Sequence, residues 1–98
     1  MEKRIGVIAI LVNNRKHIQK LNTILSEHSG IILGRMGLPI RDRGISVISL
    51  IIEGTTDSIG SLTGKIGKLE GVQVKSVLTR YREENDEPSI DPDPKEFH

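Results

Sequence analysis

The sequence predicts a small α+β sandwich whose elements follow the order β-α-β-β-α-β. Residues 5–12 and 45–52 are apolar on both faces, which is typical of strands in the interior of a sheet. Each of these stretches is followed by apolar residues at spacings of three and four, the pattern of an amphipathic helix. Two such units with right-handed crossovers interleave into an antiparallel sheet of strand order 4-1-3-2, in which the two apolar strands are central.

The first half of the chain supplies a strand, a helix and a second strand. Asn13 or Asn14 can cap the helix, which ends at Ser29-Gly30 and carries one apolar stripe: Ile18, Leu21, Ile24 and Leu25. The second strand, residues 31–38, is predicted to place Ile32, Gly34, Met36 and Leu38 on one face. Pro39 indicates the end or the edge of that strand, and residues 40–44 form a hairpin loop.

The second half repeats the arrangement. Thr56 is the predicted cap of the second helix, whose buried stripe is Ile59, Leu62, Ile66 and Leu69. Gly71 ends this helix. In residues 72–79 apolar and polar side chains alternate, which predicts a half-buried edge strand.

Two helices can cover only one face of such a sheet. The other face still carries apolar residues from both central strands, for example Val47 and Ile51. An exposed apolar patch of that kind usually marks an interface. We therefore expect a homodimer or a tetramer, formed through the uncovered face or by pairing of sheet edges.

Composition limits the remaining possibilities. A chain of 98 residues has room for one domain, which we place at residues 1–80. These residues carry twelve Lys and Arg against six Asp and Glu. Residues 81–98 carry two basic against seven acidic residues, and we expect this acidic tail to be disordered. The absence of cysteine excludes disulfides and cysteine-ligated metal centres. The first apolar run is too short for a membrane span, so we expect a cytoplasmic protein.

Histidine chemistry has little support within one chain. His17 and His28 border the first helix about 16 Å apart, so they cannot share one metal ion within a subunit. We therefore expect no metal site and no cofactor in the single chain, although a site shared between subunits stays open. The acidic residues are scattered, and no nucleophile with a partnered base stands out, so we expect no enzyme.

Glycines in the second helix are more informative. Gly60, Gly64 and Gly67 each cost about 1 kcal/mol relative to alanine in a helix interior, so we expect something to approach this helix closely. The neighbouring helix, another subunit and a ligand are the alternatives. The spacing does not match a phosphate-binding P-loop, since three residues instead of four separate Gly60 from Gly64.

Arginines mark a second polar region. Arg35, Arg41 and Arg43 lie around the second strand and the hairpin and are candidates for binding a carboxylate or phosphate. A solvated loop with Asp42 as the internal partner is the alternative. The two aromatic residues, Tyr81 and Phe97, lie outside the central strands, so RNA recognition by stacking is not expected, and direct nucleic-acid binding has little support.

Three stretches resemble one known family: residues 34–39 (GRMGLP), 44–52 (GISVISLII) and 62–75 (LTGKIGKLEGVQVK). They are similar to the iron-only hydrogenase system regulators, small bacterial proteins with an ACT-like, ferredoxin-like fold. The resemblance extends over residues 3–78. It implies a regulatory role near hydrogenase maturation, with a hydrogenase-maturation protein as a partner.

The resemblance also implies where a ligand would bind. ACT domains bind small ligands such as amino acids near the first strand–helix turn, often at subunit interfaces. In this chain those positions are Val12, Asn13 and Asn14, which would face the second-helix glycines of a neighbouring subunit. We expect Asn13, Asn14, Gly60 and Gly64 to contact the ligand. We therefore expect a regulatory module that senses a small ligand or binds a partner protein as a homo-oligomer. The alternative is a metal-responsive regulator whose site is shared between subunits and uses His17 or His28.

Overall fold

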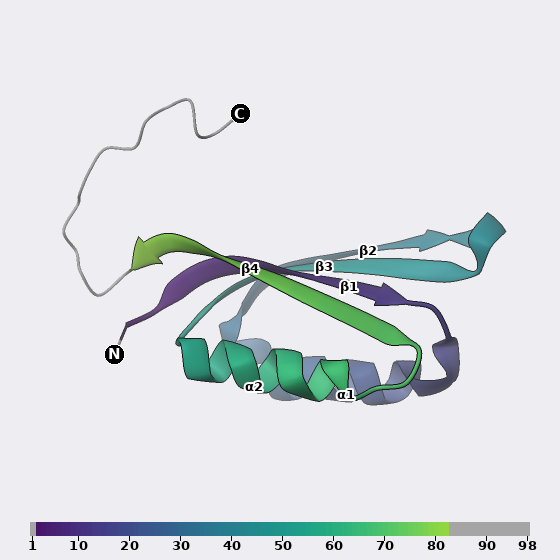
Figure 1. The fold of residues 1–98 in the computed structure, drawn as a ribbon, viewed down its shortest axis with the longest axis horizontal. Helices are drawn as coiled ribbons and strands as arrows, with labels where there is room; N and C mark the ends of the chain where they lie inside the picture. The colour runs from purple at the N-terminus through teal and green to yellow at the C-terminus, as the bar shows by residue number, and fades with distance from the viewer. Residues whose placement is uncertain (1, 83–98) are drawn as a thin grey trace, which may run out of the picture.

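The computed structural model describes residues 2–82, which form a four-stranded antiparallel sheet with two α-helices on one side (Figure 1). The strands are β1 (Arg4–Val12), β2 (Ile32–Ile40), β3 (Ile45–Gly54) and β4 (Val72–Arg82). The helices are α1 (Ile18–Glu27) and α2 (Thr56–Gly67), and short 3-10 turns precede and follow α1 and join β2 to β3. Most of the predicted tail, residues 83–98, and with it Phe97, lies outside the described residues.

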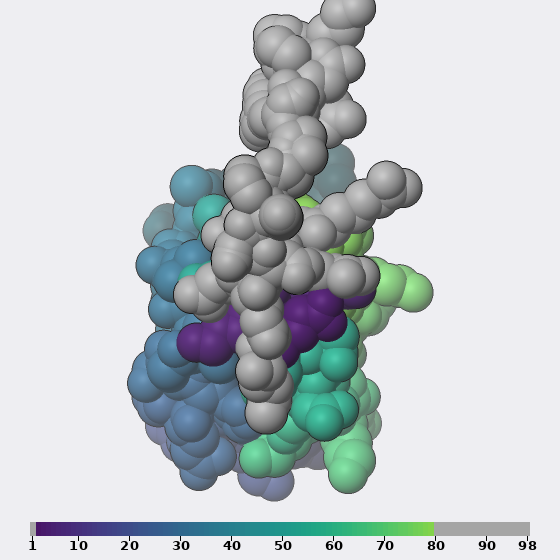
Figure 2. Space-filling view, turned by 90° about the vertical axis from the view of Figure 1, so that its left-hand side faces the viewer, coloured from purple at the N-terminus to yellow at the C-terminus, as the bar shows by residue number. Residues whose placement is uncertain are grey.

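The strand order β2-β3-β1-β4 is the predicted order read from the other edge. β1 pairs with β3 along its whole length and with β4 on its other side. Figure 2 looks at the molecule from the end where β1 begins, and it shows the purple start of the chain between the blue residues around β2 and the green residues of α2 and β4. The prediction that the two strands apolar on both faces are central is confirmed.

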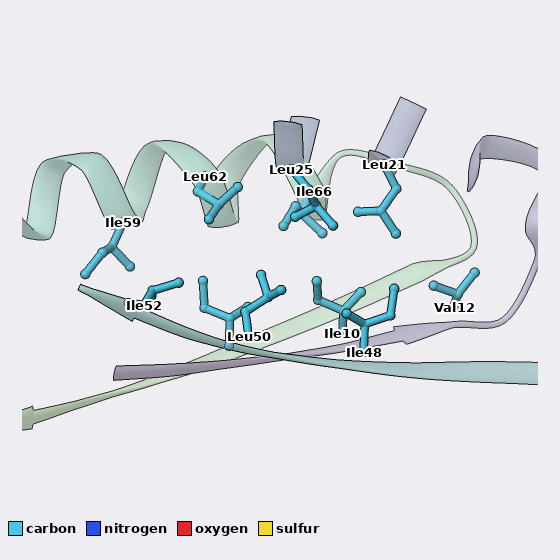
Figure 3. Close-up of a cluster of buried hydrophobic side chains, with 11 residues drawn as sticks. Ile10, Val12, Leu21, Leu25, Ile48, Leu50, Ile52, Ile59, Leu62 and Ile66 are labelled. Atoms are coloured by element: carbon cyan, nitrogen blue, oxygen red, sulfur yellow. The ribbon is translucent and has the colours of Figure 1, made fainter. Parts of the chain in front are cut away.

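The core lies between the sheet and the helices (Figure 3). Alternate residues of β1 and β3 point toward the helices, and the buried stripes of α1 and α2 pack onto them. The fully or almost fully buried side chains are Ile8, Ile10, Val12, Leu21, Leu25, Ile48, Leu50, Ile52, Ile59, Leu62 and Ile66. Val72, Val74 and Leu78 of β4 are partly buried against this cluster, as expected for a half-buried edge strand.

Two local predictions were wrong by one residue. Thr55, not Thr56, caps α2, because the Ser58 N–H donates to the Thr55 hydroxyl oxygen at 3.1 Å. In β2, a bulge between Ile32 and Gly34 shifts the alternation of faces. Ile32 therefore packs against the core, whereas Met36 and Leu38 lie on the opposite face. Pro39 lies within this edge strand and does not end it.

The face of the sheet away from the helices is open. We define the uncovered face by the register as Ile5, Val7, Ala9, Leu11, Gly34, Met36, Leu38, Ile40, Ile45, Val47, Ser49, Ile51, Glu53, Gln73, Lys75 and Val77. Its most exposed large apolar residues are Met36 (71%), Val77 (69%), Leu38 (60%), Ile51 (48%) and Val7 (42%). The expectation of an apolar face without helices is thus confirmed for the single chain. Within the described residues, no helix is both long and apolar enough to cross a membrane.

Candidate functional site

The turn that follows β1 is held by the turn that follows α2. The carbonyl oxygen of Gly71 accepts hydrogen bonds from the N–H of Asn13 at 2.7 Å and the N–H of Asn14 at 3.3 Å. Gly71 has a φ of +80°, a conformation that residues with a Cβ rarely adopt. These contacts join the start of the first helical segment to the start of β4, and we call this region the asparagine corner (Asn13, Asn14, Lys16, His17, Glu70 and Gly71).

The two asparagines present polar groups at the surface of this corner. The Asn14 side-chain oxygen accepts a hydrogen bond from the Lys16 N–H at 2.8 Å and so caps the first 3-10 turn. The Asn13 side chain is exposed, and its amide can both donate and accept hydrogen bonds. Because the Asn13 backbone is held by Gly71, a ligand would meet a fixed main chain with an adjustable side chain.

Charged groups surround the corner loosely. The Glu70 carboxylate lies 3.9 Å from the Lys16 ammonium and 3.9 Å from the His17 imidazole. Lys16 and Glu70 are well exposed, so their attraction contributes at most about 1 kcal/mol to the stability of the fold. The backbone hydrogen bonds, not this ion pair, set the geometry of the corner.

The predicted glycines lie elsewhere in the same chain. Gly67 is the last residue of α2, and Gly64 and Gly60 are about 5 and 10 Å farther from the corner along the helix axis. In the described part of the chain, apart from the adjacent residues and the nearby backbone of α2 itself, no atom lies within 4 Å of where a Cβ on Gly60 or Gly64 would be. The neighbouring helix therefore does not explain these two glycines, and the approach of another subunit or a ligand stays a prediction. Asn13 and Asn14 do not meet Gly60 and Gly64 within one chain.

The histidines and arginines are spread out. The His28 Nδ1 lies 2.9 Å from the Ile24 carbonyl oxygen at the end of α1, whereas His17 belongs to the asparagine corner. Within residues 2–82, no three His, Asp or Glu side chains gather closely enough to hold a metal ion. Arg41 and Arg43 share the turn between β2 and β3, but Arg35 is six residues before Arg41, about 20 Å along an extended strand.

A groove that sequence reasoning missed lies on the helix layer. It has a volume of about 400 Å³ and is lined by Gln19, Lys20, Thr23, Ile24 and Leu69, from α1 and the segment after α2. Its polar residues, Gln19, Lys20 and Thr23, lie beside the apolar stripe of α1. From the sequence alone, polar residues at such positions are expected to face solvent. None of the predicted site residues lines it.

The fold agrees with comparisons to known proteins. A family model described as "Iron-only hydrogenase system regulator, putative", the TM1266-like family, matches residues 4–76. The chain belongs to this family. No curated protein matches the chain, so the family description, which names a regulator and not an enzyme, is the functional information that these relatives supply.

Solved structures support the same assignment. The uncharacterized protein TM1266 from Thermotoga maritima is 35% identical, with a TM-score of 0.76 over 80% of this chain and 99% of that one. The ACT domain of the GTP pyrophosphokinase of Chlorobium tepidum is 20% identical, with a TM-score of 0.62 over 76% of this chain and 86% of that domain. The C-terminal domain of the MgtC protein from Mycobacterium tuberculosis is 10% identical, with a TM-score of 0.58 over 80% of this chain and 89% of that domain. The last two similarities show the fold alone, and the similarity to the ACT domain confirms the predicted ACT-like fold class.

Proposed function

We propose that this member of the TM1266-like family is a regulatory module that senses a small ligand as a homo-oligomer. The observation that carries the proposal is the asparagine corner, where the Gly71 carbonyl holds the Asn13 main chain at 2.7 Å and the asparagine side chains stay exposed. A fixed backbone beside adjustable polar groups suits the recognition of a small polar molecule. The corner is also the strand–helix turn at which the ACT-like fold leads us to expect a ligand.

The glycines of α2 suggest why a second subunit is needed. Gly60 and Gly64 expose helix backbone, and nothing in the described chain occupies the space beside them. A glycine pair in a helix interior costs stability, so an approach by a ligand or a neighbouring subunit offers a reason for it. In our proposal the ligand lies between the asparagine corner of one subunit and the α2 glycines of another.

A thermal-shift screen of the full chain against amino acids, nucleotides and divalent metals tests this function. A ligand at about 100 times its dissociation constant stabilises the folded state by about 2.7 kcal/mol, which is several degrees for a domain of this size. We expect an amino acid or a similar polar molecule to raise the unfolding temperature. If nothing shifts it, the ligand-sensing proposal fails, and the family's regulatory role then points to a protein partner such as a hydrogenase-maturation protein.

Matched variants locate the site once a ligand is found. Asn13→Ala should abolish the shift, whereas Asn22→Ala, an exposed asparagine on α1, should leave it unchanged. Gly60→Val and Gly64→Val should also abolish it without loss of the fold, because valine has a higher helix propensity than glycine. A ligand response that survives all three variants would place the site elsewhere, and the groove on the helix layer would be the next region to mutate.

One observation favours a metal-responsive regulator as the second candidate. If the His28 Nδ1 carries the proton and donates it to the Ile24 carbonyl oxygen, the Nε2 lone pair is available to a metal ion. The described chain offers no complete site, so further ligands would come from another subunit. A shift with nickel, zinc or iron(II) that disappears in His17→Ala or His28→Ala would replace the small-molecule proposal with this one.

A further inference from the structure

The uncovered face of the sheet has a pattern of charge centred on one residue. Its two charged members are Glu53 on β3 and Lys75 on β4, which lie on opposite sides of the central strand β1. Glu53 is level with Ile5, two residues before Val7, and Lys75 is level with Ala9, two residues after it. Val7 is therefore the midpoint of the line that joins Glu53 to Lys75.

These two charges cannot neutralise each other within one chain. Strands lie about 4.8 Å apart and rise about 3.4 Å per residue, so two strands and four residues separate the two Cα atoms by about 17 Å. Between them lies an apolar row of the face, Ile51, Val7 and Val77, whose members are paired side by side across β3, β1 and β4. An apolar row between a single positive and a single negative group is suited to a partner with the same pattern reversed.

A second copy of this chain has that reversed pattern. We infer that two copies stack face to face through the uncovered face and are related by a two-fold axis. The axis lies in the plane of contact and passes through Val7. It is perpendicular to the line from Glu53 to Lys75. This axis places Lys75 of each copy opposite Glu53 of the other, so each dimer forms two opposite-charge pairs. Val7 meets its own counterpart at the centre.

A further exposed residue lies on the same axis. Met36 is level with Ala9 and Lys75 along the strand direction, and it lies on β2, two strands away from β1. This position falls on the proposed two-fold axis, about 12 Å from Val7. Met36 is the most exposed large apolar residue of the face, at 71%. The stacking therefore covers it with the Met36 of the second copy, and a flexible thioether side chain fits such a self-contact well.

Pairing of sheet edges is the competing arrangement, and the structure disfavours it at β2. That edge strand carries a bulge between Ile32 and Gly34 and a proline at position 39, both of which interrupt the hydrogen-bonding of an added strand. A domain of fewer than 100 residues also buries a smaller share of its surface than a larger domain does, so covering this face adds burial that the single chain lacks.

The inference rests on the homo-oligomer of the proposed function. The stacking leaves both helix layers on the outside of the dimer, so the proposed ligand site needs a second contact between subunits, and charge reversal tests the stacking separately. Sedimentation velocity over a micromolar range should show a dimer of the full chain. Lys75→Glu and Glu53→Lys, each alone, oppose like charges twice per dimer and should raise the dimer dissociation constant about tenfold or more. The double variant restores both pairs and should return the constant to that of the original chain.

Controls keep the test independent of folding. Lys20→Glu makes the same charge change on α1 in the helix layer and should leave the dissociation constant unchanged. Met36→Glu, on an exposed edge-strand site, should dissociate the dimer, while Met36→Leu should not. Circular dichroism checks that each variant is folded.

The outcomes separate the two claims. A monomer at every concentration would overturn both this stacking and the homo-oligomer of the proposed function. A dimer that the single reversals leave intact, or that the double variant fails to restore, would overturn the stacking alone and direct attention to the β4 edge and the α2 glycines.

Discussion

A Cβ on residue 71 would lie 2.5 Å from the Cβ of Asn14, closer than real side chains approach. Gly71 and Asn14 belong to two turns that are distant in sequence and lie against each other in the fold. The Gly71 carbonyl accepts hydrogen bonds from Asn13 and Asn14, so the absence of a side chain at position 71 is what lets the two turns meet. The geometry of the candidate site therefore depends on a glycine outside the predicted set.

Replacing this glycine should be costly. In Gly71→Ala the new methyl group meets Asn14, and the φ of +80° adds a penalty for any residue with a Cβ. We expect a loss of about 2 kcal/mol or more in the free energy of unfolding. Urea denaturation of the full chain at one protein concentration measures it.

Gly64→Ala is the matched control for that substitution. Gly64 is in the interior of α2 with open space beside it, so alanine should stabilise the chain by about 0.5–1 kcal/mol. Equal effects of the two substitutions would show that the contact between Gly71 and Asn14 does not form in solution.

The architecture was predictable because it depends on which residues are apolar. β1 and β3 read as apolar on both faces, and in the structure they are central, with one face in the core and the other on the uncovered face. Ile59, Leu62, Ile66 and Leu69 were predicted as the buried stripe of α2. The first three are buried, and Leu69, which follows the helix, is partly buried against the core. Burial of apolar surface dominates folding energetics, so it leaves a periodic signal that one sequence can show.

Features decided by a single residue were not predictable in the same way. The bulge after Ile32 inserts one position, and every later side chain of β2 changes face as a result. Nothing in the apolar pattern of that strand, which contains two glycines and a proline, marks where the extra residue lies. The geometry of the candidate site could not be predicted either, because the contact between Asn13 and Gly71 joins residues that only the complete fold brings together.

The choice between Thr55 and Thr56 as the α2 cap can be measured directly. Thr55→Ala removes the oxygen that accepts the Ser58 N–H, and it should lower the free energy of unfolding by about 1 kcal/mol. Thr56→Ala changes an exposed residue in the first turn and should shift it by no more than about 0.5 kcal/mol. Thermal and urea unfolding of the two variants side by side give the comparison, and a larger loss in Thr56→Ala would reverse our assignment of the cap.

The position of the core is tested by two identical truncations, one at a buried leucine and one at an exposed leucine. Leu50 is fully buried in β3 between the sheet and the helices, whereas Leu33 at the β2 bulge is 61% exposed. Leu50→Ala leaves a cavity and should lower the free energy of unfolding by about 2–5 kcal/mol. Leu33→Ala loses little buried surface and should lower it by less than about 1 kcal/mol. Unfolding at low protein concentration, where self-association contributes least, isolates the effect on the single chain. Similar losses from both truncations would mean that the edge at Leu33 is covered in solution, which would return edge pairing at β2 to consideration.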